Sequence, residues 1–431
     1  MKELEEIIQE LNLSSMRMKP VIKVIGLGCA GCNAVENMHQ QGIEGVELIV
    51  CDTDLQSLKA AVSVEKKIQL GTDLTEGMGT GHSVELGRRA ALEDCKKLEE
   101  AIGEDTNMLF IATNMGGGTG TGAAPVVAEL ARKKGILTIA VVTIPMNLDG
   151  DEVGEKSKKG VELLQEQADS VLLISSEKVY ENFADLPETV ASAKSGEVIA
   201  TAVKGVAEII TIHGTVNVDF ADVDTVMRNS DVFVMGSGEA SGEGRAAKAI
   251  KNALGSPLLE NADIIGAKYI LLSLMSGNDE EGMTLIEYTS SMRYLQQKVG
   301  YNSNIITGYR ENEAYNEGDK KGKVVATVVA TQFRTDLGKP MLTPKAESQP
   351  LLKNEESEPM RVGEYVNEVS KEDKILKVDE PKERKSSVKG KEPRLAEKKD
   401  KQTNGKKGFQ SFLKGFGIIS EGESVDDENR K

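Results

Sequence analysis

The chain has 431 residues and a net charge of -16, with 39% hydrophobic residues, 4% aromatic residues and no tryptophan. This length suits roughly two or three domains, and the acidic balance argues against a general nucleic-acid-binding protein, which needs a basic surface. Four cysteines in a chain of this size do not make a disulfide framework.

The first 19 residues are acidic and amphipathic, and we expect them to form a short helical N-terminal extension. They lack the apolar core of a secretory signal peptide. No stretch of the chain approaches the roughly 18 consecutive apolar residues that a membrane span needs. We therefore expect a protein of the reducing cytoplasm that has no membrane-spanning segment and binds no nucleic acid.

From residue 20 to residue 194, apolar runs alternate with helical patterns, which is typical of a parallel α/β sheet. A long apolar helix and a loop follow at 195–219, and a second, smaller α/β domain is expected at 220–336. Strands are expected at 21–28, 46–54, 107–113, 136–145, 169–176, 230–240, 267–277, 303–312 and 323–333. Helices are expected at 33–42, 83–103, 124–135, 195–214, 244–254 and 284–300.

Beyond residue 336 the chain is rich in Lys, Glu, Ser and Pro and poor in apolar residues. This composition predicts a disordered linker at 337–407. The tail, residues 408–431, begins with the apolar segment GFQSFLKGFGII. That segment is either a peptide that docks on a partner or residual hydrophobicity in a flexible tail.

A glycine-rich turn joins the first predicted strand to the first predicted helix. Gly26, Gly28 and Gly31 have the spacing G-x-G-x-x-G, and Asp52 follows at the end of the second strand. This is the pattern of a dinucleotide-binding turn with its acidic ribose partner. Taken alone, it favours an NAD-dependent dehydrogenase; the alternative is a tight strand–helix turn without a ligand.

A second glycine-rich stretch, NMGGGTGTGAAPVV, has five glycines and two threonines at positions 116–122. Between a strand and a helix, such a loop points backbone N–H groups at one spot and makes an anion site, to which Thr119 and Thr121 add hydroxyls. No G-K-[ST] follows, so it is not a P-loop. Two glycine loops at the carboxyl ends of parallel strands would grip a di- or triphosphate from both sides, which a dehydrogenase does not need.

The GGGTGTG signature resembles the tubulin/FtsZ superfamily and, within it, a divergent member of the bacterial cell-division FtsZ family. The same resemblance extends, over roughly residues 20–335, to IKVIGLG, GCNAVENM, CDTDLQSLK, IQLGTDLTEGMGTG, GILTIAVVTIP and NVDFADVDTVM. It implies a GTP-binding α/β domain joined by a long central helix to a smaller α/β domain. It also implies a cytoplasmic GTPase that stacks head to tail into filaments and assembles a cytokinetic ring at the division site.

The resemblance places the catalytic residues on an acidic N-x-D-x-x-D loop, which completes the GTP site of the next subunit. Here that loop contains Asn217, Asp219 and Asp222. Two carboxylates aimed at a γ-phosphate can orient and polarise a water for in-line attack. A head-to-tail contact that does not close makes a filament. The alternative, from the residues alone, is an acidic turn that caps a strand or helix.

The resemblance also implies the residues that hold GTP or GDP and, through the nucleotide phosphates, Mg²⁺. Asp54 matches the acid near the magnesium, and Gly79 and Gly81 match the loop that senses the γ-phosphate. No metal site made by protein side chains alone is expected. The phosphate-binding residues of the two glycine-rich turns are Gly28, Cys29, Ala30, Gly31, Cys32, Asn33, Gly116, Gly117, Gly118, Thr119, Gly120, Thr121 and Gly122.

The base and ribose side departs from the family pattern. Asp149 can accept a hydrogen bond from a ribose hydroxyl, but Val153 stands where the family has a basic residue. Ser176 replaces the asparagine that contacts guanine, Ser192 replaces the stacking aromatic, and Glu197 takes the position that reads the guanine N–H edge. A lost stack costs on the order of 1–3 kcal/mol. We therefore expect weaker or less guanine-selective binding than in a typical relative.

Cys29 and Cys32 form a C-x-x-C pair in the first turn. With no second pair and three histidines in the chain, a zinc site is not expected, and small side chains tolerated in a phosphate loop are the better interpretation. A thiolate beside a phosphate would be repelled, so thiol reactivity should fall when nucleotide binds.

The altered base side leaves open a second possibility, a relative that binds nucleotide weakly and co-assembles as a structural or regulatory subunit. The intact acidic loop favours the GTPase instead. The tail fits the GTPase interpretation, since a flexible linker would let it reach membrane-tethering and regulatory division proteins. The segment GFQSFLKGFG is not a good copy of the usual tail peptide of the family.

Overall fold

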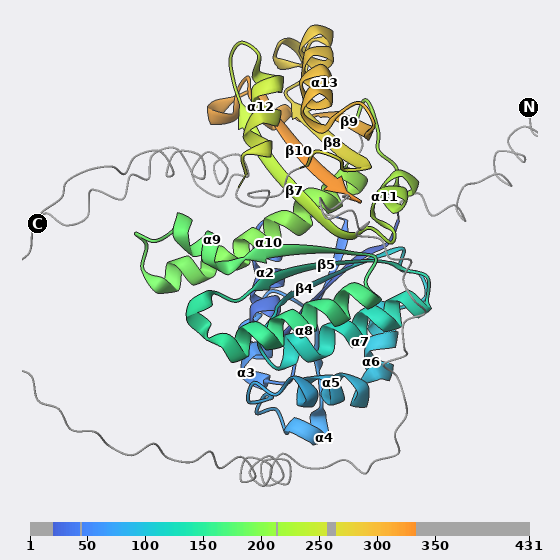
Figure 1. Ribbon diagram of the computed structural model, residues 1–431, viewed down its shortest axis with the longest axis vertical. Coiled ribbons are helices and arrows are strands. Elements are labelled where there is room, and N and C mark those ends of the chain that lie inside the picture. Colours follow the sequence, from blue (N-terminus) through green and yellow to red (C-terminus); the bar gives the residue numbers. More distant parts are fainter. Residues whose placement is uncertain (1–19, 44, 213, 257–263, 333–431) are drawn as a thin grey trace, which may run out of the picture.

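The computed structural model describes residues 20–43, 45–212, 214–256 and 264–332 (Figure 1). The predicted N-terminal extension, linker and tail lie outside these residues. Within them, ten strands form one sheet in the order β3-β2-β1-β4-β5-β6-β7-β10-β8-β9. The strands are β1 (Ile22–Leu27), β2 (Val46–Asp52), β3 (Lys66–Gln69), β4 (Met108–Asn114), β5 (Leu137–Ile144), β6 (Ser170–Ser175), β7 (Asp231–Ala240), β8 (Tyr269–Ser276), β9 (Asn304–Glu311) and β10 (Val324–Thr331).

The helices fall into three sets by position in the chain. Those of the first set are α2 (Gly28–Gln40), α3 (Leu55–Ala60), α4 (Thr72–Thr75), α5 (Val84–Glu93), α6 (Cys95–Ile102), α7 (Thr119–Lys133), α8 (Asp151–Gln167) and α9 (Ser176–Asn182). The long helix α10 (Glu188–Thr211) follows, and the last set is α11 (Phe220–Met227), α12 (Arg245–Leu254) and α13 (Leu285–Val299). Short 3-10 turns are η1 (Asn147–Asp149), η2 (Asp279–Glu281), η3 (Glu313–Tyr315) and η4 (Gly318–Lys320).

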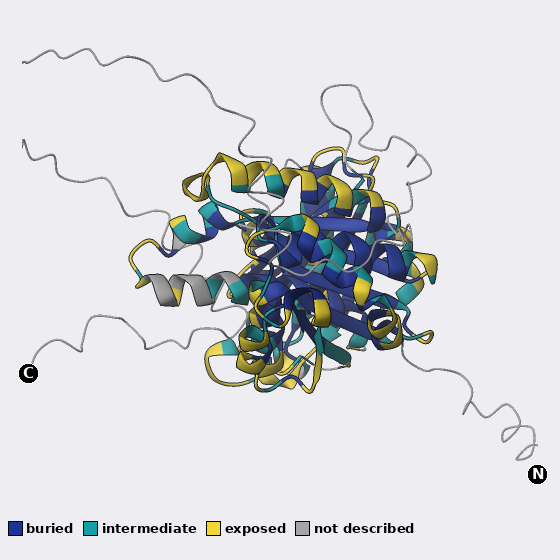
Figure 2. Ribbon diagram, turned by 90° about the horizontal axis from the view of Figure 1, so that it is seen from below, coloured by how far each residue is buried: buried dark blue, intermediate teal, exposed yellow. Residues whose placement is uncertain are grey.

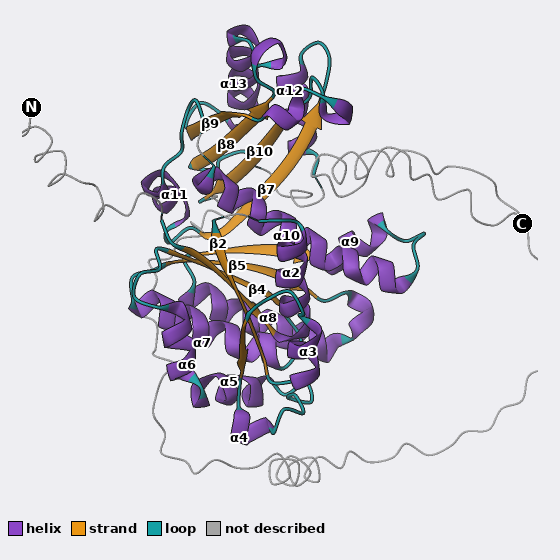
Figure 3. Ribbon diagram, turned by 180° about the vertical axis from the view of Figure 1, so that it is seen from behind, coloured by secondary structure: helices purple, strands orange, loops and turns teal. Residues whose placement is uncertain are grey.

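Strands β1 to β6 are all parallel and lie between two helical layers. Every residue of β1 is buried, as expected for an apolar strand covered on both faces. One face of the sheet packs against α2 and α10, and the other packs against α5, α6, α7 and α8 (Figure 3). Figure 2 shows the buried strands inside and the exposed residues on the outer sides of the helices. The predicted α/β fold class with a parallel sheet is confirmed.

Strand β7 joins this sheet to the smaller unit. Its first two residues pair in parallel with β6, and the rest of the strand, from Phe233 to Ala240, pairs antiparallel with β10. Strand β10 is antiparallel to β8, and β8 is parallel to β9. Helices α12 and α13 contribute to the core of this smaller unit. Helix α10 shares a core with α2 and with residues of β7, β8 and β10, so it lies between the two units as expected (Figure 1).

The prediction of one long helix at 83–103 is wrong in one respect, because the helix is broken at Asp94 into α5 and α6. The Asp94 carboxylate is buried and accepts hydrogen bonds from the backbone N–H of Gly71 at 2.8 Å and of Thr72 at 3.4 Å. Asp94 at the break therefore anchors the turn after β3. Helical periodicity reflects only neighbouring residues, so it cannot predict this contact between distant segments.

Helix α8 was not expected from the sequence. Its buried face consists of Ser157, Gly160, Val161, Leu164 and Gln167, which recur at helical spacing but include only two large apolar side chains. A Cβ on Gly160 would lie 2.3 Å from the Cγ2 atom of Thr121, so the missing side chain is what lets α8 pack closely on α7. A helix that packs through small residues has a weak hydrophobic pattern.

Candidate functional site

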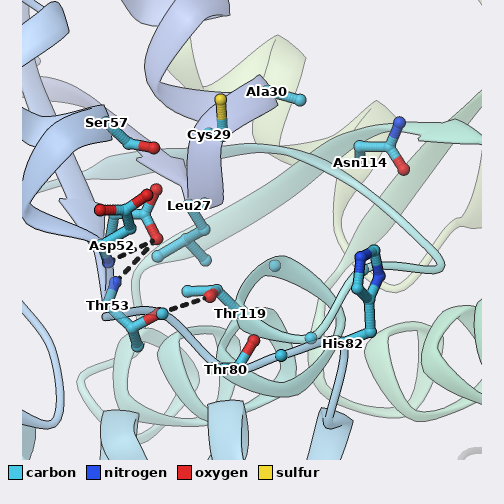
Figure 4. A pocket seen from close by; sticks show the side chains of 17 residues that line it. Leu27, Cys29, Ala30, Asp52, Thr53, Ser57, Thr80, His82, Asn114 and Thr119 are labelled. Carbon is cyan, nitrogen blue, oxygen red and sulfur yellow. Dashed lines mark hydrogen bonds between the residues drawn. The ribbon is translucent and has the colours of Figure 1, made fainter. Parts of the chain in front are cut away.

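A cavity of about 400 Å³ opens where β1, β2 and β4 end (Figure 4). The carboxyl ends of parallel strands meet at one edge of a sheet, which is where ligands of α/β proteins bind. The cavity is lined by Leu27, Gly28, Cys29, Ala30, Asp52, Thr53, Asp54, Ser57, Gly79, Thr80, Gly81, His82, Asn114, Gly117, Gly118, Thr119 and Gly120.

Two helices begin at this cavity. Helix α2 starts at Gly28 and α7 starts at Thr119, so residues expected in loops lie in first helical turns. Neither start has a side-chain cap or an acidic residue in its first turn. A Cβ on Gly28 would lie 3.3 Å from the backbone N of Gly120, so the two starts are neighbours. Their uncapped N–H groups and helix dipoles together make a strong anion site.

The glycines of the second loop have different tasks. A Cβ on Gly118 would lie 2.1 Å from Thr80 Oγ1, one on Gly120 2.1 Å from Thr113 Oγ1, and one on Gly122 2.2 Å from the carbonyl oxygen of Val84. These three glycines therefore allow close packing within the protein. In contrast, a Cβ on Gly117 would have no heavy atom within 4 Å, so this residue presents bare backbone to the cavity.

Gly116 and Gly31 also serve the fold rather than the cavity wall. Gly116 has a φ of 106°, and a Cβ there would lie 2.7 Å from the Cγ1 atom of Val153. Val153, which stands where the family pattern has a basic residue, thus packs over the loop. A Cβ on Gly31 would lie 2.4 Å from the carbonyl oxygen of Ala112, which fixes how closely α2 approaches β4.

The two threonines of the loop differ in the same way. Thr119 lines the cavity, and its hydroxyl is 2.7 Å from the hydroxyl of Thr53 (Figure 4). Thr121 is 1% exposed, and its hydroxyl accepts a hydrogen bond from the backbone N–H of Gly116 at 2.8 Å. Thr119 is therefore the hydroxyl available to a ligand, whereas Thr121 holds the loop in shape.

Two carboxylates, Asp52 and Asp54, stand in the wall of the cavity. Asp52 is 3% exposed, and its Oδ1 atom accepts hydrogen bonds from the backbone N–H groups of Thr53 and Asp54. Its Oδ2 atom is buried and has no well-formed hydrogen bond in the described part of the chain, although the Ser57 hydroxyl is close enough to act on its pKa. Burial raises the pKa of Asp52 above its ordinary value in spite of these donors.

The C-x-x-C pair does not form one site. Cys29 is exposed at the cavity, whereas Cys32 is buried and its Sγ lies 3.7 Å from the carbonyl oxygen of Cys51. Burial raises the pKa of both Cys32 and Cys51 far above the ordinary value, so these two are inert thiols of the core. Among the residues that the structure describes, no group of three His, Cys, Asp or Glu side chains could hold a metal ion by itself.

The residues expected on the base and ribose side lie outside the cavity wall, as does Asn33 on the exposed side of α2. Asp149 accepts a hydrogen bond from the backbone N–H of Met146 at 2.7 Å, which closes η1. Ser176 is 6% exposed. Glu197 forms an ion pair with Lys194 one helical turn away on α10, with Nζ 2.7 Å from Oε2. The side chain of Ser192 is outside the part that the structure describes.

The acidic loop lies at the opposite edge of the sheet. Asn217 accepts a hydrogen bond from the backbone N–H of Gly214 at 2.7 Å, and Asp219 and Asp222 lie at the start of α11. At the other end of α11, Arg228 contacts the carbonyl oxygen of Gly135, next to the amino end of β5. Figure 1 shows α11 on the side of the sheet away from α9, which follows the carboxyl end of β6. None of the three acidic-loop residues lines the cavity.

Several cavity residues were not singled out from the sequence, or were singled out for another ligand. Asp52 was expected only as the ribose partner of a dinucleotide. Asn114 is the last residue of β4, Thr53 directly follows β2, and Thr80 lies between two predicted glycines, so position could have indicated all three. His82 and Ser57 carry no such signal. The residues added by the structure are Leu27, Thr53, Ser57, Thr80, His82 and Asn114.

Comparison with known proteins gives two family matches. Residues 21–184 match the GTPase domain of the tubulin/FtsZ family, and residues 232–334 match the C-terminal domain of the FtsZ family. The cell division protein FtsZ of Azotobacter vinelandii is 41% identical over 322 residues, which cover 74% of this chain and 79% of that protein. Cell division protein FtsZ 1 of Thermococcus kodakarensis is 38% identical over 360 residues, covering 83% and 91%.

Solved structures give the same result. The empty FtsZ dimer of M. jannaschii has a TM-score of 0.66 and 37% identity, covering 77% of this chain and 92% of that chain. CetZ2 of Haloferax volcanii has a TM-score of 0.61 at 20% identity, covering 72% and 92%, which is a likeness of fold alone. These findings confirm the expected family and fold class. In the described residues, no helix has both the length and the apolar character to cross a bilayer.

Proposed function

Because the chain belongs to the FtsZ family of tubulin-like cell-division GTPases, we propose that it hydrolyses GTP between successive subunits of a filament and assembles a cytokinetic ring. The observation that carries this proposal is the pair of uncapped helix starts, α2 and α7, at one cavity beside the bare backbone of Gly117. Together they suit two or three linked phosphates. A dinucleotide-binding dehydrogenase would need only one of these two anion sites, so the arrangement argues against that alternative.

The position of the acidic loop supports an active site shared between two subunits. It lies near the amino end of β5, the parallel neighbour of β4, whose carboxyl end lines the cavity, and an eight-residue strand such as β5 spans about 25 Å. The loop of one chain therefore does not reach the cavity of the same chain. Head-to-tail stacking would bring Asp219 and Asp222 of one subunit to the cavity of the next, where they would orient the attacking water.

A magnesium ion fits the cavity as a companion of the nucleotide. The orphaned Oδ2 atom of Asp52, the neighbouring Asp54 and the hydroxyls of Thr53 and Thr119 are hard oxygen donors of the kind that Mg²⁺ prefers. In the part of the chain that the structure describes, side chains alone do not complete a coordination shell, so phosphate oxygens and waters would supply the rest. When bound, the ion would neutralise phosphate charge that Asp52 and Asp54 otherwise repel.

A second candidate function is a relative that binds nucleotide weakly and co-assembles with another filament protein. The ion pair between Lys194 and Glu197 favours this alternative, because it occupies the carboxylate expected to read guanine. The loss of the stacking aromatic at position 192 acts in the same direction. Neither observation touches the phosphate side, so we place the weakness in base selection rather than in phosphate binding.

The remaining parts of the proposal concern segments outside the described residues. We propose that the tail at 408–431, carried on the linker at 337–407, binds membrane-tethering and regulatory division proteins. The protein would then gather in the cytoplasm at the division site. We also propose the domain boundaries at 194 and 219, within the described residues, and at 336, outside them.

Phosphate release from GTP and from ATP, each over a series of protein concentrations, tests the proposed function. We expect release from GTP above a critical concentration, because the active site needs two subunits. Release proportional to protein concentration from the lowest concentration would contradict the shared site. No release at any concentration with either nucleotide would replace the GTPase by the co-assembling relative.

A further inference from the structure

His82 is exposed in the wall of the cavity, on the tight turn between Gly81 and the start of α5. Figure 4 shows its ring at the end of the cavity away from Asp52. Gly81 and His82 have φ values of 55° and 64°, so two consecutive residues adopt the left-handed conformation. Residues other than glycine seldom take that conformation, because the Cβ atom brings a steric cost; histidine takes it more often than most, as asparagine and aspartate do.

The charges around His82 distinguish its imidazole from the other side chains of the cavity wall. Among the described residues that line the cavity, it is the only one whose side chain can carry a positive charge, whereas Asp52 and Asp54 carry negative charge. From α8, Lys156 places its Nζ 3.5 Å from the His82 carbonyl oxygen and is itself paired with Glu152. The Cys29 thiol is the remaining titratable group of the wall.

The layers of the fold indicate which part of a nucleotide reaches His82. Glu197, expected at the base, lies on α10, which covers the same face of the sheet as α2. The turn that carries His82 precedes α5, on the opposite face with α7. A nucleotide with its base toward α10 must therefore extend past the ends of the strands, over the starts of α2 and α7, to the opposite face of the sheet. Its outermost phosphate then lies toward the turn at residues 79–83.

We propose that His82 is a specificity-determining residue that favours a nucleoside triphosphate over a diphosphate, by donating an imidazole N–H to the outermost phosphate. The inference rests on the proposed nucleotide function of this cavity. A neutral imidazole donates one such hydrogen bond, and the protonated ring adds charge that strengthens it. A diphosphate has no group at this position, so its affinity is independent of His82.

The left-handed backbone provides a clean substitution. His82→Gly removes the imidazole and also the steric cost of a Cβ at this φ, so folding is expected to be undisturbed or improved. Loss of affinity in this variant then reports on the side chain and not on the turn. His39→Ala is the matched control, because His39 is an exposed histidine of α2 that does not line the cavity.

The test measures binding of a slowly hydrolysed GTP analogue and of GDP to the full chain. For the unaltered protein and for H39A, we expect the triphosphate to be preferred. In H82G the preference should fall by about five- to tenfold, and GDP affinity should be unchanged.

An H82G variant that keeps the preference for the triphosphate would overturn the role of His82 while leaving nucleotide binding in place. Equal losses of GTP-analogue and GDP affinity would also overturn it, since the turn would then act on the whole site. If the unaltered protein binds neither nucleotide, the proposed function fails and this inference fails with it. Thermal unfolding of H82G at or above the unaltered midpoint would exclude a folding defect as the cause.

Discussion

Asp219 and Asp222 cap each other's backbone at the start of α11. The N–H of Asp222 donates to Oδ1 of Asp219 at 2.9 Å, and the N–H of Asp219 donates to Oδ2 of Asp222 at 3.1 Å. The capping alternative that the residues alone suggested is therefore real, and it does not compete with the proposed catalytic role. Each carboxylate has a second oxygen outside the cap, so one pair of side chains can fix the helix and face a neighbour.

This double use predicts that asparagine separates the two roles at position 222. An amide oxygen accepts the same hydrogen bond as a carboxylate oxygen, so Asp222→Asn should change the free energy of unfolding by less than about 0.5 kcal/mol. Phosphate release should fall by about a hundredfold or more, because the anionic base is gone. Urea unfolding and phosphate release measure the two effects. A variant with normal turnover would show that the carboxylate at 222 is only a cap.

The orphaned oxygen of Asp52 predicts an effect whose sign depends on magnesium. Asp52→Asn retains an acceptor for the N–H groups of Thr53 and Asp54 but removes the charge. In Mg²⁺ the variant should bind GTP about tenfold more weakly, because a cation ligand is lost. In a chelator it should bind more tightly than the unaltered protein, because a repulsive carboxylate is gone. Titration with labelled nucleotide under both conditions checks this reversal, and a loss of the same size in both would disprove it.

Alanine at two adjacent glycines should affect different properties: stability at Gly118 and nucleotide binding at Gly117. A Cβ at position 118 would lie 2.1 Å from Thr80 Oγ1 and 2.8 Å from the carbonyl oxygen of Ser83, so Gly118→Ala should destabilise the protein by about 2 kcal/mol. Gly117→Ala meets no atom within 4 Å and should leave stability nearly unchanged while weakening nucleotide binding. Paired urea and binding curves measure both. If G117A binds normally, the bare backbone there has no ligand role.

The ion pair between Lys194 and Glu197 on α10 predicts that removal of the lysine increases selectivity for the guanine base. Lys194→Ala frees the Glu197 carboxylate, whose two oxygens both accept from Lys194 Nζ. The ratio of GTP to ATP affinity should rise by about three- to tenfold, and the added Glu197→Gln should cancel much of the rise. Competition binding with the two nucleotides measures the ratio. An unchanged ratio would place base recognition elsewhere.

Acid stability should depend on the pair of Arg245 and Glu287 in the smaller unit. Burial alone would raise the pKa of Glu287, but hydrogen bonds from Arg245 and Thr284 outweigh burial and hold it below its usual value of 4.5. A folded pKa below the unfolded one gives stability that is present above pH 4.5 and is lost as the pH falls through the folded value. Glu287→Gln should therefore flatten the pH dependence of the unfolding free energy below this point and leave its slope at neutral pH unchanged.

The parts of the fold that could be predicted from the sequence are those encoded by neighbouring residues. The apolar run of β1 and the glycine-rich turn after it are contiguous, so both were located. The break at Asp94 depends on the N–H of Gly71, and α8 packs through Gly160 against Thr121, so neither has a local pattern. Distance along the chain, rather than weakness of the interactions, made these features invisible.

The same limit applies to the candidate site. The glycine stretch at 116–122 was rightly expected at a strand end, but its glycines were all attributed to a ligand. What a side chain at Gly118 or Gly122 would meet comes from residues more than thirty positions earlier. His82 is visible only once the turn is seen to face the cavity. A sequence indicates that a site exists more readily than which of its residues face inward.

The placement of cavity and acidic loop at opposite edges of one sheet has an arithmetic consequence for the proposed stacking. A filament of stacked subunits has one subunit interface fewer than it has subunits. The cavity of one terminal subunit is therefore never reached by an acidic loop. A pair of copies can turn over only one of its two nucleotides, whereas a long row can turn over nearly all of them. Turnover per copy then rises with the length of the row and levels off, and the cavity without an acidic loop lies at the same end of every row.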